Sequence, residues 1–199
     1  MKIGIVGGTF NPIHIAHMYL VTECKELLDL DRMLIIPNGD PPHKDNRVTA
    51  KEHRYNMVKL ASRDFKEINV SDMEVKSNEP SYTYKTLEML SVKYKEDQLY
   101  FIIGADSLIN FKTWKKPQRI LELATLVCFD RPGYKSSEVE AAAAWVKDNG
   151  GNLIIIDSLE LEISSTDIRN RIKEGKPAQA FLHPKVFKYI MDNGLYKGE

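Results

Sequence analysis

Two histidines at helical spacing follow a glycine turn near the start of the chain. The segment from Gly7 to His17 reads GGTFNPIHIAH and leads from an apolar run into a helix-like one. Two glycines let the backbone approach a phosphate closely, and the free N–H groups of a following helix attract an anion. His14 and His17 are three residues apart, so both imidazoles project from the first helical turn. The segment predicts a phosphate site; a tight turn with two incidental histidines is the alternative.

A second cluster of anion-binding residue types lies near the other end of the chain, where residues 163–169 read ISSTDIR. Ser164 and Asp167 have the spacing of a capping box, so hydroxyls and free N–H groups gather at a helix start. Arg169 follows within one turn and adds a cation. This motif predicts a second anion-binding helix start. Taken alone, the motif would favour the alternative, a well-capped helix with a solvated arginine.

The elements that position these motifs are strands and helices in alternation. The expected strands are residues 3–6, 33–37, 68–75, 99–103, 126–129 and 153–156. The expected helices are residues 16–29, 51–63, 83–94, 118–124, 137–147, 166–174 and 184–192. Such alternation predicts an α/β fold, Rossmann-like and doubly wound, with a mostly parallel sheet and helices on both faces. Ligands bind beyond the carboxyl ends of strands in such sheets, where both motifs fall.

Length and composition further narrow the classes of protein to which the chain can belong. The 199 residues contain no repeat, low-complexity tract or long linker, which predicts one domain with residues from about 164 to 199 as a small helical subdomain. The 28 basic and 28 acidic side chains balance, so no overall field favours nucleic acid or an anionic membrane. Cys24 and Cys128 lack the spacing of a disulfide framework or zinc site.

The chain begins with an apolar run too short for a signal peptide, and no stretch approaches the ~20 apolar residues of a membrane span. We therefore expect a cytoplasmic protein whose partners are small anionic molecules, with neither nucleic acid nor membrane among them. A homo-oligomer remains open.

The first motif resembles the opening loop of the nucleotidyltransferase superfamily of adenylyl- and cytidylyltransferases, roughly GGTFDPIHxGH. In that superfamily the paired histidines contact the ATP phosphates, and a motif resembling residues 163–169 helps to hold the triphosphate. Asn11 stands where Asp is usual, and Ala16 where Gly is usual. Both departures are modest, because Asn keeps a side-chain acceptor and Ala is the smallest alternative to Gly.

Four middle motifs resemble the nicotinate-nucleotide adenylyltransferase branch: PPHK at 41–44, SYTYKTL at 81–87, IIGADSL at 102–108 and FKTW at 111–114. The resemblance implies that Lys44 adds a mobile cation over the phosphates. Backbone N–H groups near Thr83 and Tyr84 would receive the nicotinate carboxylate, and Trp114 would stack on the pyridinium ring. Asp106 would accept hydrogen bonds from a ribose or the pyridine nucleotide, although a helix N-cap is its alternative role.

The resemblance implies adenylyl transfer from ATP to nicotinic acid mononucleotide, giving nicotinic acid adenine dinucleotide and pyrophosphate in NAD biosynthesis. The catalytic candidates are His14, His17, Lys44 and Arg169. The ATP-binding candidates are Gly7, Gly8, Thr9, Phe10, Gly104, Asp106, Ile163, Ser164, Ser165 and Thr166. The acceptor-binding candidates are Ser81, Thr83, Tyr84, Asp106 and Trp114.

The chemistry needs little from the protein beyond placement and charge. The acceptor's phosphate is the nucleophile and is largely dianionic near pH 7, so no general base is required. No dense carboxylate cage is visible, so we expect no metal site of the protein's own and Mg²⁺ carried by ATP. Because charge-assisted hydrogen bonds are roughly twice as strong as neutral ones, the nicotinate form should be preferred over the amide.

Two other classes compete with this interpretation. A phosphopantetheine adenylyltransferase or a cytidylyltransferase would share the end motifs but lack the combined middle ones. A nucleotide-binding regulator could keep the fold without catalysis, and would bind ATP without releasing pyrophosphate. The intact histidine pair and second motif favour an enzyme.

Overall fold

The fold is built on a six-stranded sheet with the strand order β3-β2-β1-β4-β5-β6, in a computed structural model that describes residues 1–39, 48–130, 137–157 and 161–198. The strands are β1 (Lys2–Gly8), β2 (Arg32–Pro37), β3 (Ile68–Val70), β4 (Gln98–Gly104), β5 (Thr125–Asp130) and β6 (Leu153–Asp157). All five strand pairings are parallel. This order and direction confirm the Rossmann-like prediction, and they place the topological switch point between β1 and β4.

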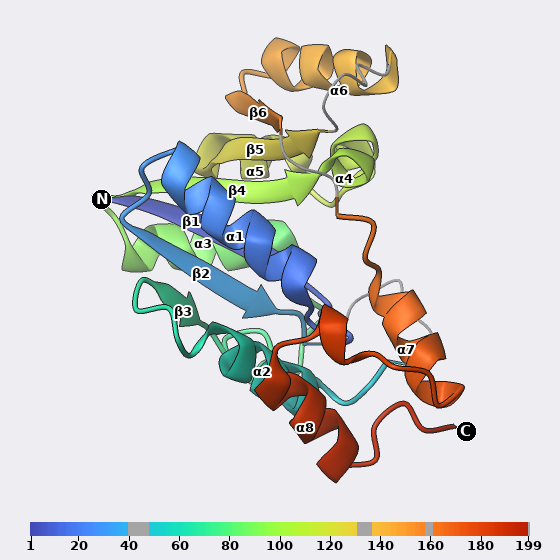
Figure 1. Cartoon of the computed structure of the whole chain (residues 1–199). Coiled ribbons are helices and arrows are strands. Elements are labelled where there is room, and N and C mark those ends of the chain that lie inside the picture. The colour runs from blue at the N-terminus through green and yellow to red at the C-terminus, as the bar shows by residue number, and fades with distance from the viewer. Residues whose placement is uncertain (40–47, 131–136, 158–160, 199) are drawn as a thin grey trace.

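Helices follow the strands and cover the sheet (Figure 1). They are α1 (Ile15–Leu27), α2 (Lys51–Ser62), α3 (Thr83–Lys93), α4 (Ala105–Ile109), α5 (Pro117–Leu123), α6 (Ser137–Asp148), α7 (Ser165–Lys173) and α8 (Pro184–Asp192), with 3-10 turns η1 (Phe111–Thr113) and η2 (Gln179–Phe181). The seven expected helices are present. The five-residue α4 was not expected, because one turn is too short to show a hydrophobic period.

Side chains that alternate along the strands build two separate apolar cores, one on each face. On β2, Met33 and Ile35 join a cluster with α1, α2, α7 and α8, while Leu34 and Ile36 join one with α3, α4, α5 and α6. This is the arrangement expected when strands are buried on both sides. Through Ile168 in α7, the C-terminal helices share a core with α1; a separate subdomain at 164–199 stays a prediction.

The strand expected at residues 68–75 is wrong in its second half, because β3 ends at Val70. A turn follows, in which the N–H of Lys76 donates to the carbonyl of Asp72 at 2.8 Å and the N–H of Met73 donates to the hydroxyl of Ser71 at 3.3 Å. Ser and Asp offer the backbone such local partners in competition with a sheet. The turn brings Glu74 beside α3.

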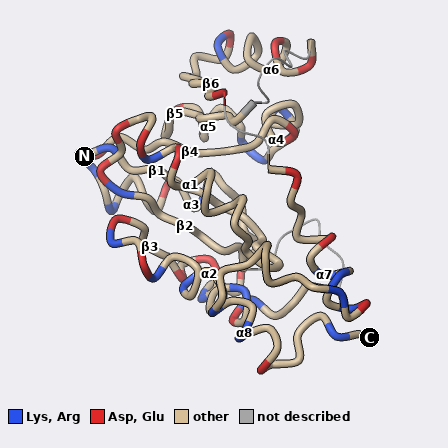
Figure 2. The backbone as a smooth tube through the Cα atoms, in the orientation of Figure 1, with Lys and Arg blue, Asp and Glu red and all other residues tan. Residues whose placement is uncertain are grey.

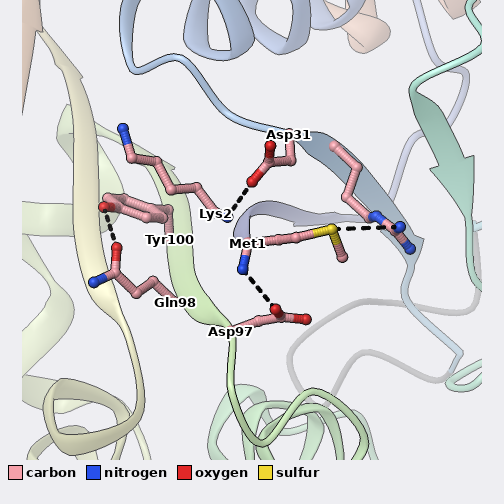
Figure 3. A network of polar contacts seen from close by, with 7 residues as sticks. Met1, Lys2, Asp31, Asp97, Gln98 and Tyr100 are labelled. Atoms are coloured by element: carbon pink, nitrogen blue, oxygen red, sulfur yellow. Dashed lines mark hydrogen bonds and ion pairs between the residues drawn. The ribbon is translucent and has the colours of Figure 1, made fainter.

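The amino end of β1 is tied to its neighbours by polar contacts (Figure 3). The terminal ammonium of Met1 bonds Asp97 Oδ1 at 2.7 Å, just before β4, and the N–H of Lys2 donates to Asp31 Oδ2 at 2.6 Å, just before β2. These contacts fix the central strands at one end. The opposite, carboxyl end carries the site.

Basic and acidic side chains, which are equal in number, are interspersed over the backbone (Figure 2). Within the described residues, no helix combines the length and the apolar character needed to cross a bilayer.

A methyl group added at Gly4 should destabilise the fold. Its Cβ would lie 2.3 Å from the Sδ of Met33 and 2.7 Å from the Cδ1 of Leu30, both in the core. We expect Gly4→Ala to lower the free energy of unfolding by about 1–3 kcal/mol, the usual cost of overpacking, in urea titrations. The matched control is Gly104→Ala, where no described atom beyond the two neighbouring residues lies within 4 Å of the added Cβ; equal stability of the two variants would contradict the prediction.

Candidate active site

The loop after β1 ends with the two predicted histidines stacked on each other. His14 is the N-cap of α1, with extended backbone, and the helix begins at Ile15. The imidazoles of His14 and His17 lie 3.7 Å apart between centroids at an angle of 29°. The backbone N–H of His14 donates to Nδ1 of His17 at 3.2 Å, so one histidine orients the other. The structure therefore brings the pair together at the helix start.

Both histidines are neutral near pH 7 in the free protein, because burial lowers their pKa values. Burial lowers the pKa of His14 to about 4. Burial, and then the neighbouring His14, lower the pKa of His17 to about 3. Nδ1 of His14 is buried and makes no hydrogen bond within the described residues. A bound phosphate would favour the imidazolium forms, because a close anion raises the pKa of a histidine.

The two predicted anion-binding segments, far apart in sequence, meet in the structure. The hydroxyl of Ser165, the first residue of α7, donates to the carbonyl of Pro12 at 2.8 Å. Nη1 of Arg169 donates to the carbonyl of Asn11, also at 2.8 Å. The start of α7 is thereby held against the loop that leads into α1.

The capping pattern predicted for α7 is present. Ser164 is the N-cap, and its hydroxyl oxygen accepts from the N–H of Asp167 at 3.0 Å. Nη2 of Arg169 also donates to Thr166 Oγ1 at 3.2 Å, which fixes the guanidinium over the first turn. Ile163 and Ser164 also line a cavity of about 440 Å³ along α7. The lining of this cavity includes neither His14 nor Arg169.

Asn11, one of the two departures from the superfamily pattern, has a defined partner. It is buried, and its Oδ1 accepts a hydrogen bond from the hydroxyl of Tyr196 at 2.8 Å. Burial raises the pKa of Tyr196 to about 12, so this hydroxyl stays a donor at neutral pH. The amide of Asn11 thus supplies the acceptor that an Asp would supply. Ala16, the other departure, is buried in α1.

Arg54 is a residue of this site that the sequence did not single out. It lies on α2 and is 1% exposed. Its guanidinium donates to the carbonyls of Thr9 at 2.8 Å and Gly39 at 2.7 Å, and its Nε donates to Thr49 at 2.9 Å. Arg54 therefore joins the loops that follow β1 and β2. The available signal was its position four residues before Val58, on the apolar face of the helix.

A cavity of about 100 Å³ lies at the carboxyl ends of the central strands. Its lining includes Gly7, Asn38, Glu74, Ser81, Thr83 and Trp114. Trp114 packs edge-on against Phe101 of β4, with centroids 6.2 Å apart, and Thr83 begins α3. The cavity thus combines an aromatic wall with the start of a helix, whose first N–H groups have no partner within the helix itself.

Four other residues that the sequence predicted to bind ligands do not line this cavity: Phe10, Tyr84, Gly104 and Asp106. Tyr84 is buried in the core, with Nζ of Lys116 4.6 Å from its ring centroid, and does not line the cavity. Gly104 is the N-cap of α4, and Asp106 is exposed in its first turn. Phe10 is buried and meets His17 edge-on at 5.2 Å.

The backbone of Gly8 accepts from the N–H of Asn38 at 2.8 Å, which ties the ends of β1 and β2 together. Lys44 and its PPHK motif lie outside the described residues. Within the part of the chain that the structure describes, no three His, Cys, Asp or Glu side chains are grouped to hold a metal.

Comparison with known proteins decides the family. A family model described as cytidylyltransferase-like matches residues 5–171. A "probable nicotinate-nucleotide adenylyltransferase" of Clostridium beijerinckii is 42% identical, over 98% of this chain and 99% of its own length. The chain belongs to the nicotinate-nucleotide adenylyltransferase family. A member from Clostridium perfringens is 39% identical over 100% of this chain and 99% of its own length.

Solved structures agree on the fold of this adenylyltransferase family. A nicotinic acid mononucleotide adenylyltransferase of Plasmodium falciparum complexed with NaAD superposes with a TM-score of 0.82 at 20% identity, covering 100% of this chain and 98% of that one. The same protein complexed with APC gives a TM-score of 0.78, with the same coverage and identity.

In this adenylyltransferase, the histidine pair should respond to a phosphate ligand. By NMR titration of the imidazole protons, we expect pKa values of about 4 for His14 and about 3 for His17 in the free protein. Inorganic pyrophosphate should raise both values, because a close anion favours the charged ring. Sodium chloride at the same ionic strength is the control. Values that pyrophosphate leaves unmoved would mean that it binds elsewhere.

Removing the guanidinium of Arg54 should cost much of the stability. Arg54→Met leaves three loop carbonyls without this donor, so we expect the free energy of unfolding to fall by roughly 2–5 kcal/mol. Arg63→Met is the matched control, because that side chain follows the same helix and is 51% exposed; it should change stability by less than about 0.5 kcal/mol. Comparable losses in urea titrations of both variants would refute a special role for Arg54.

Proposed function

We propose that this chain transfers the adenylyl group of ATP to nicotinic acid mononucleotide, giving nicotinic acid adenine dinucleotide and pyrophosphate. The observation that carries the proposal is the junction of the two helix starts, where Ser165 and Arg169 bond the loop before the histidine pair. The full-length likeness to proteins named nicotinate-nucleotide adenylyltransferase supports the choice of acceptor.

In the proposed complex, the triphosphate of ATP lies between the starts of α1 and α7. His14, His17 and Arg169 face it, together with the free N–H groups of the first turn of α7 and of the loop after β1. Lys44 is proposed as a further cation. These groups stabilise the negative charge that builds up on the leaving pyrophosphate.

The reaction then needs only in-line placement. A phosphate oxygen of the acceptor, already dianionic near pH 7, forms a bond to the α-phosphorus of ATP, and the bond from that phosphorus to the pyrophosphate oxygen breaks. No proton has to be removed from the nucleophile, which explains why neutral histidines are compatible with the site. Mg²⁺ would enter on the triphosphate and reduce its charge.

The cavity of about 100 Å³ is the proposed site of the nicotinate ring. Trp114 offers an electron-rich face to an electron-poor pyridinium. The N–H groups at the start of α3, near Thr83, would receive the carboxylate, and a charged acceptor strengthens such bonds. The cavity therefore favours the acid over the amide.

Pyrophosphate release from ATP tests the function directly. We expect turnover with nicotinic acid mononucleotide, and a kcat/KM for nicotinamide mononucleotide lower by about tenfold or more, since one charge-assisted hydrogen bond is worth that much. His17→Ala should lose most turnover and stay folded. The control His53→Ala removes a histidine that bonds Tyr189 at 2.9 Å, away from the junction, and should keep turnover. ATP binding without any pyrophosphate release would reject the proposal.

A further inference from the structure

Glu74 lines the proposed nicotinate cavity, and the reaction proposed above makes no use of it. The turn after β3 carries this residue, and its Oε1 accepts from the hydroxyl of Thr86 at 2.6 Å. Oε2 is buried and has no hydrogen-bond partner in the described part of the chain. The backbone carbonyl of Glu74 packs against Gly39 and occupies the space that a side chain at position 39 would need. The carboxyl group of Glu74 thus lies beside the cavity that we propose binds the carboxylate of nicotinate.

The charges around Glu74 are few. Burial raises its pKa, and this outweighs the opposing effects of the hydroxyls of Thr86 and Ser81 and of the positive charge of Arg54 on α2. The other described residues of the cavity wall, from β1, β2, β4, α3 and Trp114, carry no charge. Within that wall, the charge of the cavity is set by whether Glu74 holds a proton.

We propose that Glu74 determines acceptor specificity: its neutral form admits the nicotinate carboxylate to the cavity, and its ionised form excludes it. The inference rests on the proposed function. Two carboxylates in one small cavity repel each other, so the bound acid raises the pKa of Glu74 and favours its protonated form. The neutral amide meets no such repulsion. Preference for the acid should therefore be greatest at low pH and fall as the pH rises through the raised pKa of Glu74.

The ratio of kcat/KM for the acid to kcat/KM for the amide, measured against pH, isolates this effect. Both acceptors carry the same phosphate, whose own ionisation cancels in the ratio. We expect the ratio to fall about tenfold in the native protein as Glu74 ionises, the effect of a modest repulsion between the two carboxylates. Glu74→Gln cannot ionise, so its ratio should stay high and independent of pH.

Glu79→Gln is the matched control. Glu79 lies in the same loop but is exposed and pairs with Lys85, so this variant should behave like the native protein. Thr86→Val provides a second variant that leaves Glu74 in place. It removes a hydrogen bond that lowers the pKa of Glu74, so the fall in the ratio should move to higher pH.

Calorimetry gives a measurement that does not depend on turnover. Nicotinic acid mononucleotide and its amide share any protonation change at the phosphate or at the histidines. Above the pKa of Glu74, binding of the acid, compared in two buffers of different ionisation enthalpy, should therefore show an additional proton uptake relative to the amide in the native protein and in Glu79→Gln. Glu74→Gln should lack that proton uptake.

The possible failures can be told apart. A pH-independent ratio in the native protein, or an additional proton uptake for the acid over the amide that persists in Glu74→Gln, would overturn the role of Glu74 while leaving adenylyl transfer intact. Absence of turnover with both acceptors would instead reject the proposed function, and the calorimetric comparison would still decide whether Glu74 takes up the proton.

Discussion

The loop between β1 and α1 has no regular hydrogen-bonded partner strand, so side chains must hold its carbonyl groups. Arg54 donates to the carbonyl of Thr9 from α2, while Arg169 and Ser165 donate to the carbonyls of Asn11 and Pro12 from the start of α7. Buried carbonyls left without such donors would each cost on the order of 1–3 kcal/mol. Because the donors come from α2 and α7, this loop can keep its shape only when the chain is folded from near one end to near the other. The proposed phosphate site therefore also depends on the contacts from α2 and α7.

The same arrangement explains the state of the histidines. His14 and His17 stack on each other, and His17 also packs against Phe10. Burial disfavours the charged form of both rings, so they do not add two further cations to a loop that already meets two guanidinium groups. Repulsion in the empty site is thereby kept low. Their charge would arrive together with the anion that stabilises it, which makes the binding of a polyphosphate more favourable relative to that of a neutral molecule.

The sequence was sufficient for features that repeat or that cluster locally. Alternating apolar periods predicted the sheet and its two covering layers, and the capping spacing of Ser164 and Asp167 predicted the start of α7. It was insufficient where a residue acts through the tertiary structure. Arg54 appears in sequence as one polar residue of an amphipathic helix, and only the fold shows which carbonyls it meets. Glu74 was placed in a strand because the β-branched residues around it mask the Ser-Asp turn, so its position beside the cavity could not be foreseen.

The two layers of the fold also separate the two proposed ligands. α1, α2 and α7 belong to the core on one face of the sheet, and α3 with Trp114 belongs to the other. The triphosphate and the nicotinate ring would therefore approach from opposite faces and meet over the end of β1. That strand ends in two glycines: the ring of Phe10 fills the space beside Gly8, and Gly7 lines the cavity. A strand end without side chains leaves room at the switch point. The proposed reaction requires this room, because the acceptor phosphate, held from one face of the sheet, must reach the α-phosphorus of ATP, held from the other.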